Sequence, residues 1–154
     1  SSVEIPHRVI EPEEYARAKQ YLEDTRNATV NTGDLTSEGL VNGDVTVLRY
    51  FAQRVIDCAD KSTRSHTCAL TRVNMGDALA FVTLPGEPFN GISQALRKAS
   101  KYKHTFVVEL SQSQSGYVPM RDCFERGGYE TQPGIDTVAP EASDVIIDAV
   151  VKNL

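Results

Sequence analysis

Two oxygen-bearing side chains are the strongest candidates for chemistry in this sequence. Glu87 stands in the corner "LPGEPFNG" directly after a β-prone run, and Tyr117 stands in "SGYVPM" just after the next β-prone run. A carboxylate and a phenol at one rim would share a ligand. Each also has an ordinary explanation, because a glutamate suits the first turn of a helix and a tyrosine suits a half-buried strand end.

The segment between these two residues predicts how they come together. Residues 78–85 and 104–110 predict strands, and the apolar residues of 88–100 recur at helical intervals. Such a strand, helix, strand unit crosses over right-handed and leaves its strands parallel. Because open α/β sheets bind ligands beyond the carboxyl ends of their strands, we expect Glu87 and Tyr117 on the same rim.

The remaining segments predict a mixed α/β sheet layered with helices. Residues 66–73 form a strand that pairs antiparallel with residues 78–85 through the turn "NMGD". Residues 27–44, rich in Asn, Thr, Gly and Asp without a sustained period, predict a flexible loop. Further helices are expected over 11–27, 45–61 and 139–154. In the first, Glu11 is the expected N-cap and Pro12 the first helical residue. In the last, one face carries Ile147, Val150, Val151 and Leu154.

Three blocks of sequence carry a more specific signal. They are "MGDALAFVTLPGEPF", "HTFVVELSQSQSGYVPM" and "GGYE", and together they span Met75 to Glu130. In order and spacing they resemble the carboxyl-terminal part of the catalytic domain of the neutral/alkaline non-lysosomal ceramidase family. Members of that family are zinc amidohydrolases, which cleave the N-acyl bond of ceramide to give sphingosine and a fatty acid.

The resemblance implies that Glu87 and Tyr117 are zinc ligands. In the family the metal is held by the glutamate of the PGE corner, by the tyrosine of the GYVP-like block and by two histidines from earlier in the domain. It further implies attack of zinc-activated water on the carbonyl of a lipid amide. Gly86, Gly116 and Tyr129 are possible members of the site rim, although turns and strands account for them equally well.

The histidines of this chain do not stand in the family's histidine motifs. His7, His66 and His104 therefore receive no ligand assignment. The resemblance implies that residues 1–154 are the C-terminal portion of a larger catalytic domain, inactive alone and completed by its upstream part or by a separate chain. Two alternatives stay open: a single α/β domain that serves as a non-catalytic binding or assembly module, and a hydrolase of a different amide or ester.

Composition limits the partners that the chain is expected to have. Its 16 Lys and Arg against 21 Asp and Glu give a net charge of -5, so we expect no nucleic-acid partner. Its apolar runs are far shorter than the ~20 residues that cross a bilayer, which predicts no transmembrane segment. The chain shows no signal peptide, whereas the resemblance implies a secreted or membrane-surface enzyme.

Two groups of side chains have structural explanations. Cys58, Cys68 and Cys123 lack metal-ligand spacing and predict core residues or one disulfide. Arg121 and Asp122 predict a solvated surface pair.

Overall fold

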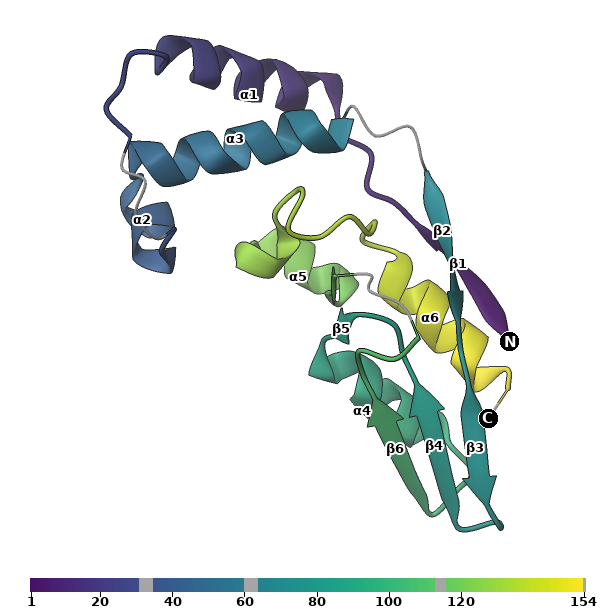
Figure 1. Cartoon of the computed structure of the whole chain (residues 1–154). Coiled ribbons are helices and arrows are strands. Elements are labelled where there is room, and N and C mark those ends of the chain that lie inside the picture. The colour runs from purple at the N-terminus through teal and green to yellow at the C-terminus, as the bar shows by residue number, and fades with distance from the viewer. Residues whose placement is uncertain (31–34, 60–63, 113–115, 154) are drawn as a thin grey trace.

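The computed structural model describes residues 1–30, 35–59, 64–112 and 116–153. The molecule is elongated, with α1 and α3 side by side at one end and a three-stranded sheet at the other (Figure 1). The helices are α1 (Pro12–Asp24), α2 (Ser37–Asn42), α3 (Val45–Ala59), α4 (Asn90–Ala99), α5 (Arg121–Arg126) and α6 (Ala142–Val151), with a 3-10 turn η1 (Tyr129–Thr131). The strands are β1 (Ser2–Pro6), β2 (Ser65–Ala69), β3 (Arg72–Met75), β4 (Leu79–Thr83), β5 (Glu87–Pro88), β6 (His104–Val108) and β7 (Tyr117–Val118).

The strands form three small sheets. β1 pairs antiparallel with β2, β4 lies between antiparallel β3 and parallel β6, and β5 pairs in parallel with β7. The expected mixed α/β class is confirmed, and so are the antiparallel pairing across "NMGD" and the parallel strands joined by α4. Short strands of this kind need a packed face to be stable, and helices supply it here.

One predicted strand is in fact two. Residues 66–73 divide into β2, which pairs with the N-terminal β1, and β3, which pairs with β4. The chain changes sheets at Leu70, whose amide donates to the Ser1 carbonyl and whose side chain is buried. An uninterrupted β-prone run does not reveal such a change of partner, because strand propensity reports no register.

The main core lies where α4 and α6 cover the sheets. Its fully buried members include Val82 and Leu84 from the β4 segment and Ile92 and Leu96 from α4. α6 buries Ala142, Ile146 and Val150, so of the predicted face Val150 is confirmed as a core residue. α6 carries apolar residues nearly all round, so its contacts with β1 and α4 decide which side is buried. Ile147 packs at the margin of the core, Val151 is exposed, and Leu154 lies outside the described residues.

The helices α1 and α3 form a second, smaller core. Ala18 packs with Ala52 and Val55, and the Arg49 guanidinium donates to the Leu22 carbonyl at 2.8 Å. The two predicted helices are confirmed: α1 ends at Asp24 rather than at residue 27, and residues 60–61 of the second prediction lie outside the described residues. Pro12 occupies the first helical turn as expected, whereas the N-cap Glu11 makes no side-chain capping hydrogen bond.

The loop predicted over residues 27–44 contains a helix that the composition did not reveal. Thr36 caps α2 by accepting a hydrogen bond from the Gly39 amide at 2.9 Å. Gly43 ends the helix in the left-handed region, at φ 71°, which glycine adopts without strain. These capping residues are the same Asn, Thr, Gly and Asp types that indicated a loop. Residues 31–34 lie outside the described residues.

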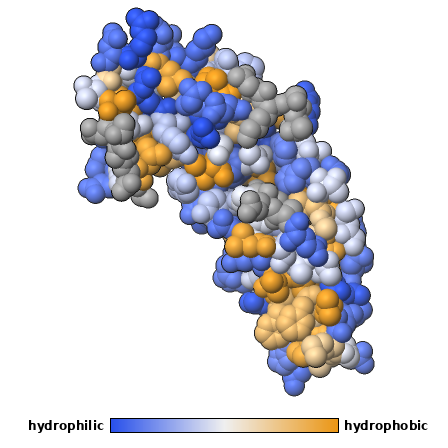
Figure 2. Space-filling view, viewed as in Figure 1, coloured by the Kyte–Doolittle hydropathy of each residue, from blue (hydrophilic) through white to orange (hydrophobic). Residues whose placement is uncertain are grey.

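The sheet β3–β4–β6 is covered by helix on one face only. The side chains of Ala80 and Val82 point into the core, whereas alternate residues of all three strands point away from it. We call this second side the open face. Figure 2 shows apolar residues gathered at this end of the molecule. The apolar residues of the open face are Val73, Met75, Leu79, Phe81, Phe106 and Val108.

A buried carboxyl group lies in the loop that follows η1. Asp136 is 1% exposed, and within the described residues neither of its carboxylate oxygens accepts a hydrogen bond. Burial raises the pKa of Asp136 to about 7, against the smaller opposing effects of the Val138 backbone and the Arg8 guanidinium. The folded state therefore retains a proton that the unfolded chain releases at much lower pH.

We expect Asp136→Asn to increase the free energy of unfolding more above neutral pH than it does near pH 4. Between 3.8 and about 7 the unfolded carboxyl is ionised while the folded one is protonated, so the free energy of unfolding falls as pH rises. The variant should recover at most about 4 kcal/mol of this lost stability, because a difference of one pKa unit corresponds to ~1.4 kcal/mol. Urea unfolding across this range measures it, with exposed Asp148→Asn as control. A stability difference that does not change with pH contradicts the prediction.

Candidate functional site

The corner after β4 positions Glu87. The chain leaves β4 through buried Leu84 and Pro85 and turns at Gly86, whose φ of 60° disfavours other residues. The Leu110 amide donates to the Gly86 carbonyl at 2.8 Å and so ties this corner to the segment after β6. Glu87 then begins β5, whereas α4 begins only at Asn90. The first-turn helix explanation for Glu87 is therefore wrong.

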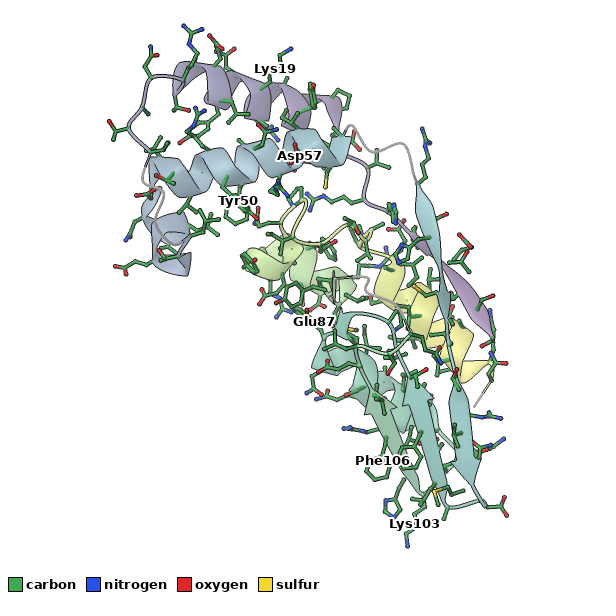
Figure 3. All side chains as sticks on the ribbon, in the orientation of Figure 1. Lys19, Tyr50, Asp57, Glu87, Lys103 and Phe106 are labelled. Atoms are coloured by element: carbon green, nitrogen blue, oxygen red, sulfur yellow. The ribbon has the colours of Figure 1, made fainter. Side chains whose placement is uncertain are left out.

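Tyr117 lies directly beside Glu87. The Glu87 amide donates to the Gly116 carbonyl at 2.8 Å, and the Phe89 amide donates to the Val118 carbonyl at 3.0 Å. This parallel ladder places Glu87 and Tyr117 opposite each other in register. Paired residues of neighbouring strands project to the same face, so the carboxylate and the phenol share one side of the β5–β7 ribbon. Both are half-buried. Figure 3 shows Glu87 near the middle of the molecule, between the three-stranded sheet and α5.

Aromatic contacts connect this pair to the helices at the far end. The ring centroid of Tyr117 lies 6.3 Å from that of Tyr129 in an edge-to-face arrangement. The Tyr129 ring is likewise 6.3 Å from that of Phe51 on α3. Tyr129, a predicted rim residue, therefore does lie beside Tyr117, at the 3-10 turn η1 rather than in the turn and short strand that "GGYE" suggested.

The negative charge of Glu87 affects the ionisation of Tyr117. The Glu87 carboxylate is the main cause of a raised pKa at Tyr117, followed by burial and by the neighbouring Tyr129 and Glu130. Two anionic oxygens at this spot would repel each other, so the phenol keeps its proton while the site holds no positive charge. A divalent cation between the two would reverse this balance.

The three histidines lie elsewhere. His7 Nε2 and His66 Nδ1 are 2.6 Å apart, where the chain leaves β1 and passes beside β2. Burial, followed by the effect of His7, lowers the pKa of His66. His104 begins β6, at the opposite end of that strand from Glu87. Over the described ranges, the His, Cys, Asp and Glu side chains form no group of three or more that could hold a metal ion.

The His7 and His66 contact is the feature that sequence reasoning missed. It depends on the antiparallel pairing of β1 with β2, which sets Ile5 opposite His66. Alternation in "SVEIPH", with Val3 and Ile5 buried, was the available signal. Without a predicted partner strand, that alternation could not indicate the contact.

The structure also bears on the predictions for the cysteines, for Arg121 and Asp122, and for membrane-spanning helices. Cys68 is a core residue, as expected, and Cys58 and Cys123 are half-buried. Arg121 and Asp122 are both exposed, as expected, but they do not pair with each other: Arg121 pairs with Asp144 at 2.6 Å and Asp122 pairs with Arg126 at 2.9 Å. The Asp122–Arg126 pair follows from helical geometry, because neighbours on a helix surface are three or four residues apart. Among the described helices, none is long and apolar enough to span a bilayer.

Comparisons with known protein families, with curated proteins and with solved structures found no match. The ligand roles of Glu87 and Tyr117 therefore stay predictions, whose structural support is the in-register pairing described above.

We expect Glu87→Gln to lower the pKa of Tyr117 in the metal-free protein, because the variant removes the negative charge that chiefly raises it. A pH titration of carbon-13-labelled tyrosine rings by NMR measures the change, with Tyr117→Phe identifying the resonance. Glu130→Gln should produce a smaller change in the same direction, because Glu130 is the weakest of the four causes. An unchanged Tyr117 titration in Glu87→Gln contradicts the geometry of the pair.

Proposed function

We propose that this chain is part of a ceramidase-like zinc amidohydrolase and supplies Glu87 and Tyr117 as two of its metal ligands. The observation that carries the proposal is the parallel register that sets these two residues side by side. They lie thirty positions apart in the sequence, and they are the two residues that the family resemblance selects.

Glu87 and Tyr117 carry donor atoms that suit zinc, but they supply only half of the four ligands that the resemblance implies. Zinc accepts carboxylate oxygen readily, whereas a phenol with an ordinary pKa near 10 becomes a ligand only when a nearby positive charge favours its ionisation. Tyr117 would ionise readily only when a cation is bound, because the negative charge of Glu87 raises the pKa of Tyr117 in the metal-free protein. The remaining ligands would come from the upstream part of the same domain or from a separate chain.

The residues of this chain have definite tasks in such a site. Bound zinc supplies an activated water and a positive charge that stabilises the developing oxyanion. Glu87 and Tyr117 would hold the metal at the strand ends, and their backbone ladder keeps the two residues opposite each other in register. Tyr129 packs edge-on against Tyr117 and limits its rotation.

An apolar hollow beside the site suits a lipid amide. It has a volume of about 230 Å³ and is lined by apolar side chains including Leu40, Val47 and Phe51, and also by Tyr129. Tyr129 therefore contacts both the hollow and Tyr117. The hollow is smaller than the roughly 300–1,000 Å³ of typical ligand pockets, so in the proposed enzyme it would accept only part of an apolar chain, with Tyr129 between that chain and Tyr117.

A second candidate function is a non-catalytic assembly module. The observation that favours it is the open face of β3–β4–β6, since large exposed apolar patches mark interaction sites. A chain of this kind would be indifferent to zinc chelators and would unfold cooperatively.

We expect zinc to lower the pKa of Tyr117 in the isolated chain. Titration with zinc near pH 9 should increase the phenolate absorbance, weakly and at high metal concentration, because only two ligands are present. Glu87→Ala and Tyr117→Phe should both abolish the increase. Glu125→Ala, on the exposed surface of α5, and Tyr102→Phe, away from the site, are matched controls. Equal responses in Glu87→Ala and in the unaltered chain would refute the metal site.

We expect zinc-dependent hydrolysis of an N-acyl sphingosine when the chain is produced together with whatever coding sequence precedes Ser1 in its gene. Glu87→Ala and Tyr117→Phe should each reduce this activity by more than about 100-fold, because even outer-shell partners of a metal are worth 10–100-fold. Hydrolysis of other amides or esters in place of the lipid amide would favour the alternative substrate class. No zinc-dependent hydrolysis of any of them would favour the assembly module.

A further inference from the structure

The open face of β3–β4–β6 is a continuous apolar surface. The strand register places Val73, Phe81 and Phe106 in one row across the three strands, and Met75 and Leu79 in the next row. The rings of Phe81 and Phe106 stack with centroids 5.1 Å apart. The residues that the register assigns to this face include no Asp, Glu, Lys or Arg. Thr83 and the exposed His104 lie on the same face, so it is mainly apolar and carries one ionisable side chain.

Water covers a large part of this surface in the isolated chain. Val73 is 54% exposed, Met75 60% and Phe106 49%. In Figure 3, Phe106 lies at the free end of the molecule, away from the helices α1 and α3. Exposing a stacked aromatic pair in this way costs free energy that burial would recover. Contiguous exposed apolar surface on a folded protein commonly marks an interface.

The total surface of the chain is large enough to include an interface. It exposes 9243 Å² at a mass of 16.9 kDa. A folded monomer of this mass typically exposes roughly 7,700 Å². The excess of about 1,500 Å² belongs to the whole elongated molecule, and the exposed side chains of the open face contribute to it.

The charges at the two ends of the open face match a second copy of the chain. Lys101 and Lys103 lie in the turn before β6, at the same end of the face as Asp77 in the β3–β4 turn, and Glu109 follows β6 at the other end, where Arg72 begins β3. A two-fold axis that lies between the two faces and runs across the strands reverses the strand direction of the partner. The lysine end of each copy then lies over the glutamate end of the other, which favours this arrangement electrostatically.

We propose that the open face is the interface of a homodimer, in which two β3–β4–β6 sheets pack face to face about a two-fold axis. Aligned sheets pack about 10 Å apart with their strands within about 30° of each other, which lets the two aromatic rows interdigitate. The two-fold symmetric dimer is also the commonest assembly of identical chains. The net charge of -5 disfavours an anionic lipid surface as the occupant. The dimer does not depend on Glu87, Tyr117 or zinc.

Sedimentation velocity over about 1 to 200 µM tests the dimer. We expect a monomer–dimer equilibrium that persists in EDTA, and a dimer dissociation constant at least about tenfold higher for Phe106→Lys. Val41→Lys is the matched control, because Val41 is 84% exposed on α2 and lies outside the open face. Circular dichroism shows whether each variant is folded. A chain that stays monomeric throughout this range overturns the proposal.

A charge reversal provides a second test that does not alter the apolar face. Lys103→Glu should weaken the dimer, and the double change with Glu109→Lys should restore it, because the antiparallel arrangement brings these positions together across the interface. Restoration supports the two-fold geometry. Equal and additive weakening by both changes contradicts it, and binding of the monomer to phosphatidylserine vesicles would identify a membrane as the occupant instead. None of these outcomes bears on the zinc proposal.

Discussion

The hydrogen bond from the Glu87 amide to the Gly116 carbonyl holds the register on which the site depends. It continues the parallel pairing of β4 with β6 past the corner at Gly86, so that two segments far apart in sequence keep a common direction beyond the sheet. Because the backbone sets this register, the carboxylate and the phenol are adjacent without any direct attraction. Their proximity is electrostatically unfavourable for two anions, as the raised pKa of Tyr117 shows.

The loop after η1 also holds the backbone of Gly116, whose carbonyl sets the register between β5 and β7. Asp136 forms an isolated antiparallel bridge with Gly116, and the Asp136 amide donates to the Gln132 carbonyl at 3.1 Å. Arg8 ties this loop to the N-terminal segment by donating to the Thr131 carbonyl at 2.8 Å. The position of Tyr117 is thus decided by contacts with residues from both ends of the chain. A buried, protonated Asp136 makes the packing of this loop dependent on pH, although its side chain is not a member of the pair.

Local patterns predicted the helices well and the strand partners only in part. The spacing of apolar residues indicated α1, α3 and α4, because helical hydrogen bonds join residues close in sequence. The division of residues 65–75 between two sheets was missed, since the partner β1 lies about sixty positions away and short strands do not specify register. In α6 the apolar residues surround the helix, so packing on β1 and α4 selected Ile146 over Val151. Arg121 paired with Asp144 rather than with its neighbour for the same reason: tertiary packing brought a better-placed partner.

By itself, the amino-acid order determined the mixed α/β class, the strand, helix, strand unit and the choice of Glu87 and Tyr117. Each of these follows from local periodicity, turn chemistry or a run of matching residues. Only the tertiary structure decided that β5 and β7 pair in register, that His7 meets His66, and that one side of β3–β4–β6 is left without a helix. The physical reason is that these features depend on hydrogen bonds and packing between distant segments, whose free energy appears only when the whole chain is folded.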